Sequence, residues 1–225
     1  MGADSQGLPQ ASGPGVTTSG VIPSSGGNGQ SSTPSPFSDI STSPYEKAIE
    51  TEAASGVLKG YPGGTFQPQG KITRGEMSAV FVRAWKLQVP TSVTKTGFSD
   101  VASTAWDAGD ISAMVKTGLI KGFPGGTFQP GGNITLAQFL TIVQRELGWQ
   151  PVAGKTLPFT DVSSSDWFYS AIAASWDHGV WVNITGSTTL AAPNQDLTRG
   201  QVAQYVYDLS QYQSSGSASS TSSAG

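Results

Sequence analysis

The chain has 225 residues, a formal net charge of −3 and only 12% charged residues. Lys and Arg form no cluster, which argues against a nucleic-acid partner, because neutralising phosphates requires clustered cations. The sequence has no cysteine and a single histidine, so disulfides and thiolate metal ligands are excluded and neither a metal nor a cofactor is expected.

The two ends differ in composition from the rest of the chain. Residues 1–36 are predicted to be a Gly/Ser/Pro-rich linker and residues 211–225 a disordered Ser-rich tail, because neither can bury enough apolar surface to offset the entropy of ordering. No stretch approaches the roughly 20 apolar residues of a membrane span. Met1 is not followed by the basic segment and apolar core of a signal peptide, so an exported protein would be expected to reach this form by processing or excision.

Between these ends the chain repeats itself three times. The segments FSDI, FSDV and FTDV begin at Phe37, Phe98 and Phe159, at equal intervals of 61 residues. Each leads to a second shared segment, ITRGE, ITLAQ or LTRGQ, which begins at residue 72, 134 or 197. We therefore predict repeats at 37–97, 98–158 and 159–210, which must pack on one another because one such unit cannot bury its apolar face alone.

A first helix is predicted early in each repeat. In repeat 1, Ser43 has the features of an N-cap, with Pro44 at the first helical position and Glu46 three residues after the cap, and Gly56 marks the end. The equivalent helices are expected at about 105–116 and 166–178.

A second helix is predicted to begin at each shared segment. Thr or Ser followed three residues later by Glu or Gln indicates a capping box, and three pairs fit: Thr73 with Glu76, Thr135 with Gln138, and Thr198 with Gln201. The intervening loops GYPGGTFQP and GFPGGTFQP are expected to turn tightly and to insert Phe66 or Phe128 into the core. The predicted fold class is all-α, built from helix-loop-helix repeats.

The carboxylates Asp39, Asp100 and Asp161 occur once per repeat and are not paired within one, so no acid/base dyad is indicated and no enzyme is predicted. Capping of the turn before the first helix is the simplest role for these residues. The Gly-rich loops lack the Gly-Lys-Ser/Thr ending of a phosphate-binding loop.

Arg74 and Arg199 lie just inside predicted helix starts, where the helix dipole opposes a cation. Either an internal Asp or Glu uses each guanidinium, or an external anion is held by it together with free helix amides. Trp106, Trp167 and Tyr45 each fall six residues after the repeat's Asp. They are expected either to pack between repeats or to form a platform for a sugar ring.

Together, the FSDV segment, the aromatic six residues after its Asp, the GYPGGTFQP loop and the ITRGE turn closely resemble S-layer homology domains, over about Phe37 to Leu209. The resemblance implies a pseudo-threefold assembly around a central bundle with one helix from each repeat. It also implies grooves that bind a secondary cell wall polymer ending in pyruvylated N-acetylmannosamine, and hence non-covalent anchoring to the wall of a Gram-positive bacterium. The chain would then be extracellular, at the cell surface or in an S-layer, with a cargo domain upstream of the linker.

Under this resemblance, Arg would bind the carboxylate, Trp the sugar ring, and Asp with loop backbone the hydroxyl and amide groups. Our hypothesis is a main site of Arg74, Asp100, Trp106 and Lys121, and a weaker site of Arg199, Asp39 and Tyr45. Lys59, Asp161 and Trp167 are further candidate ligand-binding residues.

The repeats depart from the family pattern in ways that bear on function. Leu136 stands where repeat 2 should have the motif arginine, and repeat 3 replaces the glycine loop by WVNITGSTTLAAP, losing the Lys found at Lys59 and Lys121. Repeat 1 is one residue shorter before its helix. The groove that would use Leu136 is expected to be impaired. This loss also favours the alternative, a structural module that makes protein-protein contacts in a surface layer.

Overall fold

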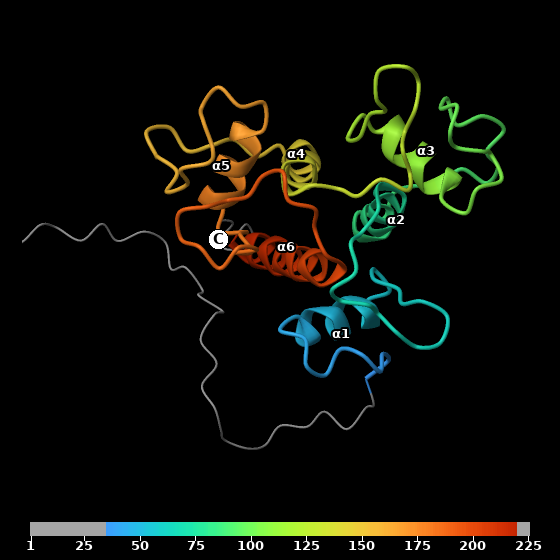
Figure 1. Cartoon of the computed structure of the whole chain (residues 1–225), viewed down its shortest axis with the longest axis horizontal. Coiled ribbons are helices and arrows are strands. Elements are labelled where there is room, and N and C mark those ends of the chain that lie inside the picture. Colours follow the sequence, from blue (N-terminus) through green and yellow to red (C-terminus); the bar gives the residue numbers. More distant parts are fainter. Residues whose placement is uncertain (1–34, 220–225) are drawn as a thin grey trace, which may run out of the picture. The chain divides into compact units, whose positions relative to one another are not determined.

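The computed structural model describes residues 35–219. Within this range the chain forms six α-helices and no β-strand, only isolated bridges (Figure 1). The all-α class expected from the sequence is therefore confirmed. The helices are α1 (Glu46–Ala54), α2 (Arg74–Ala84), α3 (Ala108–Lys116), α4 (Leu136–Leu147), α5 (Tyr169–Asp177) and α6 (Arg199–Ser219).

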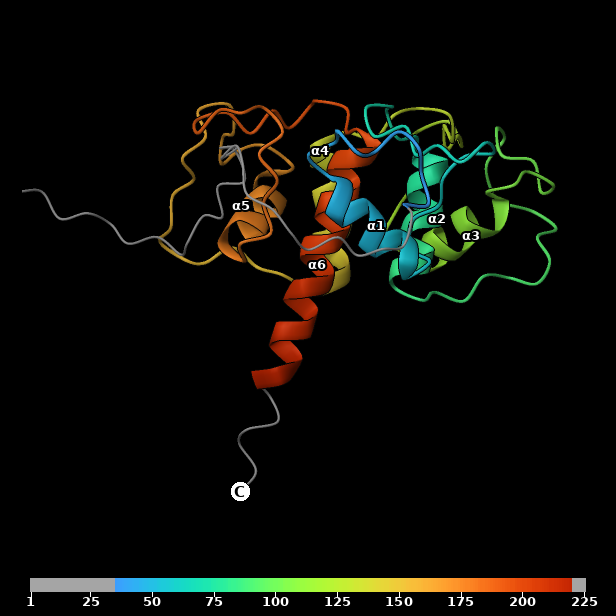
Figure 2. The ribbon, with the colours of Figure 1, turned by 90° about the horizontal axis from the view of Figure 1, so that it is seen from below.

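The first helix of each repeat packs against a helix of another repeat. α3 contacts α2, α5 contacts α4, and α1 contacts α6. Each first helix thus lies on the second helix of the preceding repeat, and α1 closes the arrangement by packing on the last helix of the chain. Figure 2 shows α6 running beyond the ends of the other helices.

The second helices α2, α4 and α6 meet through aromatic side chains. The rings of Phe81 and Phe139 are 5.2 Å apart, and those of Phe139 and Tyr205 are 5.1 Å apart. All three side chains are at most 1% exposed, and they belong to one apolar cluster that draws on all three repeats. The central bundle expected from the resemblance is therefore the core of the fold.

A closed ring of backbone hydrogen bonds joins the three shared segments just before these helices. The amide of Ile72 donates to Leu197 at 3.1 Å, that of Leu197 to Ile134 at 3.0 Å, and that of Ile134 back to Ile72 at 3.2 Å. Each repeat supplies one donor and one acceptor. Because the ring closes only with three members, the repeats form a cyclic arrangement and not an open stack.

The first amides of each central helix are satisfied by the loop of another repeat. The amide of Arg74 donates to Gly132 and that of Gly75 to Pro130, both in repeat 2. The amide of Arg199 donates in the same way to Gly70 in repeat 1. These amides are therefore already bonded, and the expectation that free helix amides would hold an external anion is wrong.

The capping boxes formed largely as predicted, but the first helices begin later than expected. The hydroxyls and carboxyl or amide groups of all three Thr–Glu/Gln pairs are reciprocally bonded. In α1, however, the N-cap is Tyr45, and Ser43 instead accepts a hydrogen bond from the Tyr45 amide in a preceding turn. The predicted capping box at Ser43 is therefore wrong.

The C-terminal boundary also differs from the prediction. The linker predicted for residues 1–36 lies almost entirely outside the described residues, but the tail predicted from residue 211 overlaps α6, which continues to Ser219. Tyr212 is the reason: its hydroxyl lies 2.9 Å from Nδ1 of His178, and its ring packs edge-on against Trp149 at 5.1 Å. A composition rich in Ser hid this anchoring residue.

Candidate functional site

The Arg74 side chain joins repeat 1 to the loop of repeat 2. Its Nε donates to the carbonyl of Phe128 at 2.9 Å and its Nη2 to the carbonyl of Lys121 at 3.0 Å. The guanidinium carbon lies 4.7 Å from the ring centre of Phe123 and 4.6 Å from that of Phe128. We call these four residues the Arg74 site.

Arg74 remains a cation although the residue is only 5% exposed. Burial lowers its pKa, and the charge of Asp100 acts in the opposite direction. A guanidinium stays protonated under such conditions. No carboxylate of the described residues forms an ion pair with it, and Nη1 takes no hydrogen bond from them. The Nη1 edge of this guanidinium therefore has no anionic partner among the described residues.

Arg199 repeats this geometry with the loop of repeat 1. Its Nε donates to the carbonyl of Phe66 and its Nη2 to the carbonyl of Lys59, both at 2.8 Å. The guanidinium carbon lies 4.5 Å from the ring centres of Tyr61 and Phe66. The same use of two loop carbonyls and two rings shows that both arginines fasten a loop onto the start of a central helix.

The Arg199 site has one further member, Glu76. Its Oε1 lies 3.5 Å from Nη1 of Arg199 and accepts a hydrogen bond from the Tyr61 hydroxyl at 2.5 Å. Its Oε2 accepts from the amide of Thr73 at 2.9 Å. The internal-acid role that the sequence left open is therefore correct for Arg199. We define the Arg199 site as Arg199, Lys59, Tyr61, Phe66 and Glu76.

The third equivalent position carries no cation. Leu136 begins α4 as Arg74 begins α2, and it is fully buried. Its amide donates to Gln195, so the backbone part of the arrangement is kept while the guanidinium is replaced by an apolar side chain.

The three repeat carboxylates hold the loops. Asp39 accepts from the amides of Phe66 and Gln67 at 2.8 and 2.7 Å, and Asp100 accepts from those of Phe128 and Gln129 at the same distances. Asp161 binds the amides of Ala191 and Ala192. The second residue of each pair has a positive φ, between 54° and 58°. The carboxylates therefore fix a strained loop backbone instead of capping the turn before the first helix.

These contacts predict a pH dependence of loop protection. Burial acts to raise the pKa of Asp39, but the two loop amides outweigh it, and the amide of Phe128 is the main cause that lowers the pKa of Asp100. A lowered pKa means that the stabilisation is complete above the ordinary value of 3.8 and is lost as pH falls below it. Amide protection factors at Phe66 and Phe128 should therefore drop below about pH 4.

Hydrogen exchange followed by NMR checks this expectation, with Asp100→Asn as the control. That variant should remove the pH dependence at Phe128 and leave it at Phe66. Protection factors that stay constant in both loops down to roughly pH 3 would contradict the assignment.

The exposed candidates lie around these sites. Lys59 and Lys121 are exposed, and neither ammonium forms an ion pair with a described residue. The backbone carbonyl of each lysine accepts a hydrogen bond from the arginine, so the backbone of each lysine lies next to a guanidinium.

The aromatic candidates do not share one environment. Trp106 and Trp167 are 69% and 66% exposed, so packing between repeats is excluded for both. Tyr45 is half-buried against Gly200, where an added Cβ would lie 2.4 Å from its ring. The shorter first repeat causes this: the N-cap position of α1 is Tyr45, whereas that of α3 is Asp107.

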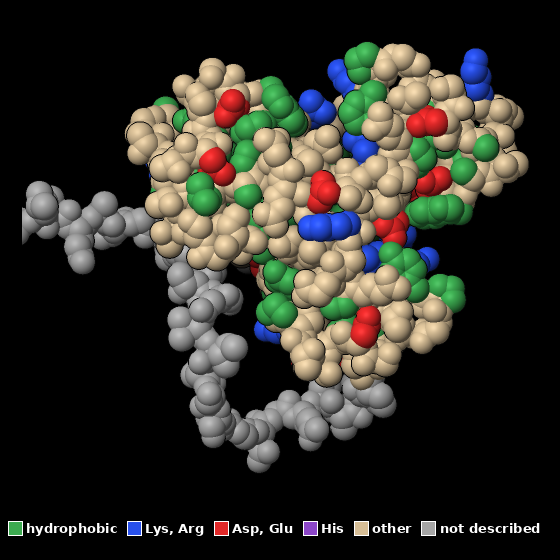
Figure 3. All heavy atoms as spheres, viewed as in Figure 1, with side chains coloured by type: hydrophobic (Ala, Val, Ile, Leu, Met, Phe, Trp, Pro, Cys, Tyr) green, Lys and Arg blue, Asp and Glu red, His purple; other side chains and the backbone are tan. Residues whose placement is uncertain are grey.

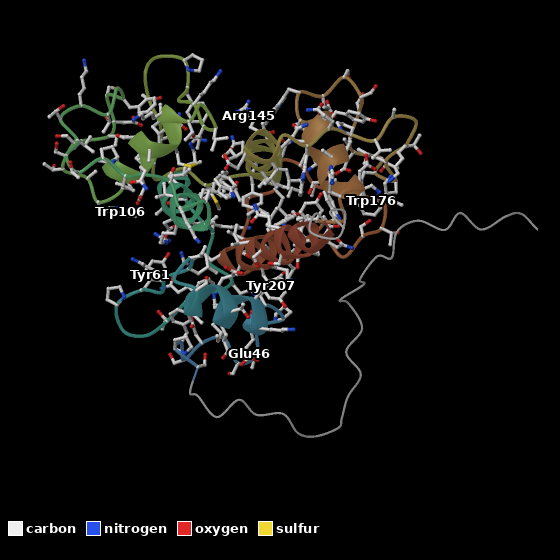
Figure 4. The ribbon with its side chains drawn as sticks, turned by 180° about the vertical axis from the view of Figure 1, so that it is seen from behind. Glu46, Tyr61, Trp106, Arg145, Trp176 and Tyr207 are labelled. Carbon is white, nitrogen blue, oxygen red and sulfur yellow. The ribbon has the colours of Figure 1, made fainter. Side chains whose placement is uncertain are left out.

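The structure changes the grouping of Trp106. Figure 4 shows Trp106 facing the loop that carries Tyr61, and Figure 3 shows a recess between these parts, bordered by hydrophobic, basic and acidic side chains. Burial raises the pKa of Asp110 in the first turn of α3, while the charge of Arg83 and, less strongly, that of Lys59 in this loop act to lower it. In this view Trp106 thus faces the loop that Arg199 holds. Arg74 keeps Asp100 and Lys121 as neighbours, and Arg199 keeps Asp39 and Tyr45.

Sequence reasoning missed two contributors. Glu76 was expected only to cap α2, and Tyr61 was only part of a loop. A comparison of the repeats could have revealed this pair, because Tyr61 occurs in the repeat that has Glu76 and Phe123 in the repeat that has Gln138. Asp107 was also missed. It is 4% exposed, burial raises its pKa, and its side chain makes no capping hydrogen bond to α3.

Two segments of the chain that contain these motifs match a known protein family. Residues 36–78 and 97–140 match the model of the S-layer homology domain. These two segments are therefore similar to S-layer homology domains. The two matched S-layer homology segments each contain the loop-holding Asp, the glycine loop and the start of a central helix. Among the described residues there is no group of side chains that could hold a metal ion, and no helix is long and apolar enough to cross a membrane.

Several known proteins are similar to part of the chain. The chain is 34% identical to a cellulosome-anchoring protein of Acetivibrio thermocellus over 142 residues, which cover 61% of this chain and 31% of that protein. It is 32% identical to a surface layer protein of Brevibacillus choshinensis over 132 residues, 56% of this chain and 12% of that protein. It is 28% identical to an amylopullulanase of Thermoanaerobacterium thermosulfurigenes over 179 residues, which cover 77% of this chain and 9% of that protein. The chain thus spans less than a third of each of these relatives.

Proposed function

We propose that the chain anchors a surface protein to the bacterial cell wall by binding an anionic secondary cell wall polymer, and that the Arg74 site binds the carboxylate. The observation that carries the proposal is the guanidinium edge of Arg74, which has no acidic partner among the described residues and lies beside the exposed Lys121. A guanidinium held in place, with an exposed lysine in the same loop, suits a carboxylate such as that of a pyruvate ketal. A binding module of this kind requires no catalytic group.

The names of the relatives support the coarse form of this function. They include a cellulosome-anchoring protein and a surface layer protein, and the amylopullulanase shows that an enzyme can contain a similar segment. The proposal therefore places the chain outside the cell, at the wall, with a cargo domain connected through residues 1–36. Residues 159–210 are proposed as a third S-layer homology domain, because Asp161, Thr198 and Gln201 make the same contacts as their counterparts.

Calorimetric titration with pyruvylated N-acetylmannosamine, and with the same sugar lacking pyruvate, tests the proposal. Lys121→Ala should weaken binding of the pyruvylated sugar by about tenfold, the size of one charge-assisted contact, and leave the melting temperature unchanged because the side chain is exposed. Lys59→Ala is the matched control and should have a smaller effect, since Glu76 already offsets the nearby guanidinium. If Lys121→Ala weakened binding of both sugars equally, carboxylate recognition at the Arg74 site would be contradicted.

Protein-protein assembly is the second candidate function. The exposed indoles of Trp106 and Trp167 favour it, because large exposed aromatic side chains are typical of interaction surfaces. Sedimentation velocity of the chain without polymer distinguishes the two functions. Concentration-dependent association that Trp106→Ala and Trp167→Ala remove would support assembly, whereas a monomer at all concentrations would support glycan binding.

A further inference from the structure

We infer that Glu76 determines ligand charge at the Arg199 site, so that this site takes an uncharged sugar residue while the Arg74 site takes the carboxylate-bearing one. The inference rests on the proposed function. It assigns the two sites different parts of one polymer, although their arginines are held by the same loop contacts.

The two sites differ at two side chains. Their loops read GYPGGTFQP and GFPGGTFQP, so only Tyr61 and Phe123 distinguish them. The third residue of the adjoining central helix is Glu76 in one case and Gln138 in the other. The tyrosine hydroxyl thus occurs in the loop where a carboxylate accepts its hydrogen bond, which makes Tyr61 and Glu76 one unit.

Glu76 occupies the guanidinium edge that is open at Arg74. At Arg199 all three guanidinium nitrogens have partners: Nε and Nη2 bind carbonyls, and Nη1 lies 3.5 Å from the Glu76 carboxylate. At Arg74, Nε and Nη2 bind the equivalent carbonyls and Nη1 has no partner among the described residues. A ligand carboxylate that bound Nη1 of Arg199 would lie next to the Glu76 carboxylate, and two negative charges so close together repel each other.

Glu76 is not easily displaced. Three donors hold it, namely the Tyr61 hydroxyl, the Thr73 amide and Arg199, and its side chain is 18% exposed. The local charge of the Arg199–Glu76 pair is zero, whereas Arg74 with Gln138 keeps one positive charge. The same loop therefore presents a cation in repeat 2 and a neutral, hydrogen-bonding surface in repeat 1.

The surroundings of the Arg199 site suit a neutral sugar. Trp106, 69% exposed, faces the loop of Tyr61, and a sugar ring stacks its apolar face on an indole (Figure 4). The remaining acceptor capacity of Glu76 suits hydroxyl or amide donors of the sugar.

Reciprocal variants test the assignment. Tyr61→Phe with Glu76→Gln reproduces the Arg74 site in repeat 1, and Phe123→Tyr with Gln138→Glu reproduces the Arg199 site in repeat 2. Both Glu and Gln already complete capping boxes in this chain, so the helix starts are preserved. In calorimetric titrations with pyruvylated N-acetylmannosamine, the first pair should raise the number of binding sites from one to two. The second pair should weaken binding by about tenfold or more.

Two outcomes overturn the inference: a wild-type chain with two equal sites for the pyruvylated sugar, or an unchanged number of sites in the Tyr61→Phe, Glu76→Gln protein. If the wild type binds the pyruvylated sugar at one site and only the variant fails to gain a second, the inference fails and the proposed function stands. If the wild type binds no sugar, both fail.

NMR of the wild type keeps the inference testable should a variant not fold. The Nε–H resonance of Arg74 should shift with the pyruvylated sugar only. The indole N–H resonance of Trp106 should shift with the sugar that lacks pyruvate. The Nε–H resonance of Arg199 should not respond specifically to pyruvate. A pyruvate-dependent shift of Arg199 equal to that of Arg74 would refute the assignment.

Discussion

Removal of residues 159–225 should abolish cooperative folding of the remaining chain. This deletion takes away α6, the helix on which α1 packs, and Leu197, without which the ring of three backbone hydrogen bonds is open. It also removes Arg199, which fastens the loop of repeat 1. Since repeats of this kind gain most of their stability from their neighbours, two of them cannot replace the closed set of three.

Thermal unfolding followed by circular dichroism measures this effect. A chain that ends at Ser215 is the control, because it keeps Tyr212 and Ser214, and it should melt as the full chain does. A sharp melting transition in the chain without repeat 3 would show that repeats 1 and 2 fold independently and would contradict the cyclic account.

Phe139→Ala should lower the free energy of unfolding by about 3–5 kcal/mol, the usual cost of truncating a fully buried aromatic residue. Phe139 is 0% exposed, stacks on Phe81 from one repeat and packs at a tilt against Tyr205 from another. The cavity would therefore lie where all three central helices meet. Because this residue links the repeats, the loss should affect the whole described fold and not repeat 2 alone.

Urea denaturation of the variant and the wild type gives the difference directly. Trp106→Ala is the control, since that indole is 69% exposed and should change stability by less than about 0.5 kcal/mol. A loss below roughly 1 kcal/mol for Phe139→Ala would mean that the rings of the central helices contribute little, and the core would have to be placed elsewhere.

The two sites have a consequence for how the module would hold a polymer. Under our proposals one site carries an uncompensated cation and the other an internally neutralised one, so the two contacts differ in their response to salt. Binding at the Arg74 site should weaken as ionic strength rises, while stacking at Trp106 should not. A single polymer that contacts both would be held through charge and through stacking together.

Local pattern determined much of this fold. The repeat interval of 61 residues, the threonines that begin α2, α4 and α6, and the insertion of Phe66 and Phe128 into the core are all readable in the sequence, because each depends on residues close in the chain. The importance of Arg74 and Arg199 was also readable, since a cation at a helix start needs a partner.

Only the tertiary structure showed which groups bind the side chains of Arg74 and Arg199. Arg199 meets Glu76 across 123 residues of sequence, and the carbonyl of Phe66 across 133. Nothing local links these positions: they meet because the third repeat closes on the first, which places the start of α6 under the loop of repeat 1. The Asp carboxylates, by contrast, bind loop amides of their own repeat, 27 to 31 residues further along the chain. The sequence determined the unit and its caps, whereas the cyclic packing of three units determined which charges are paired and which stay open.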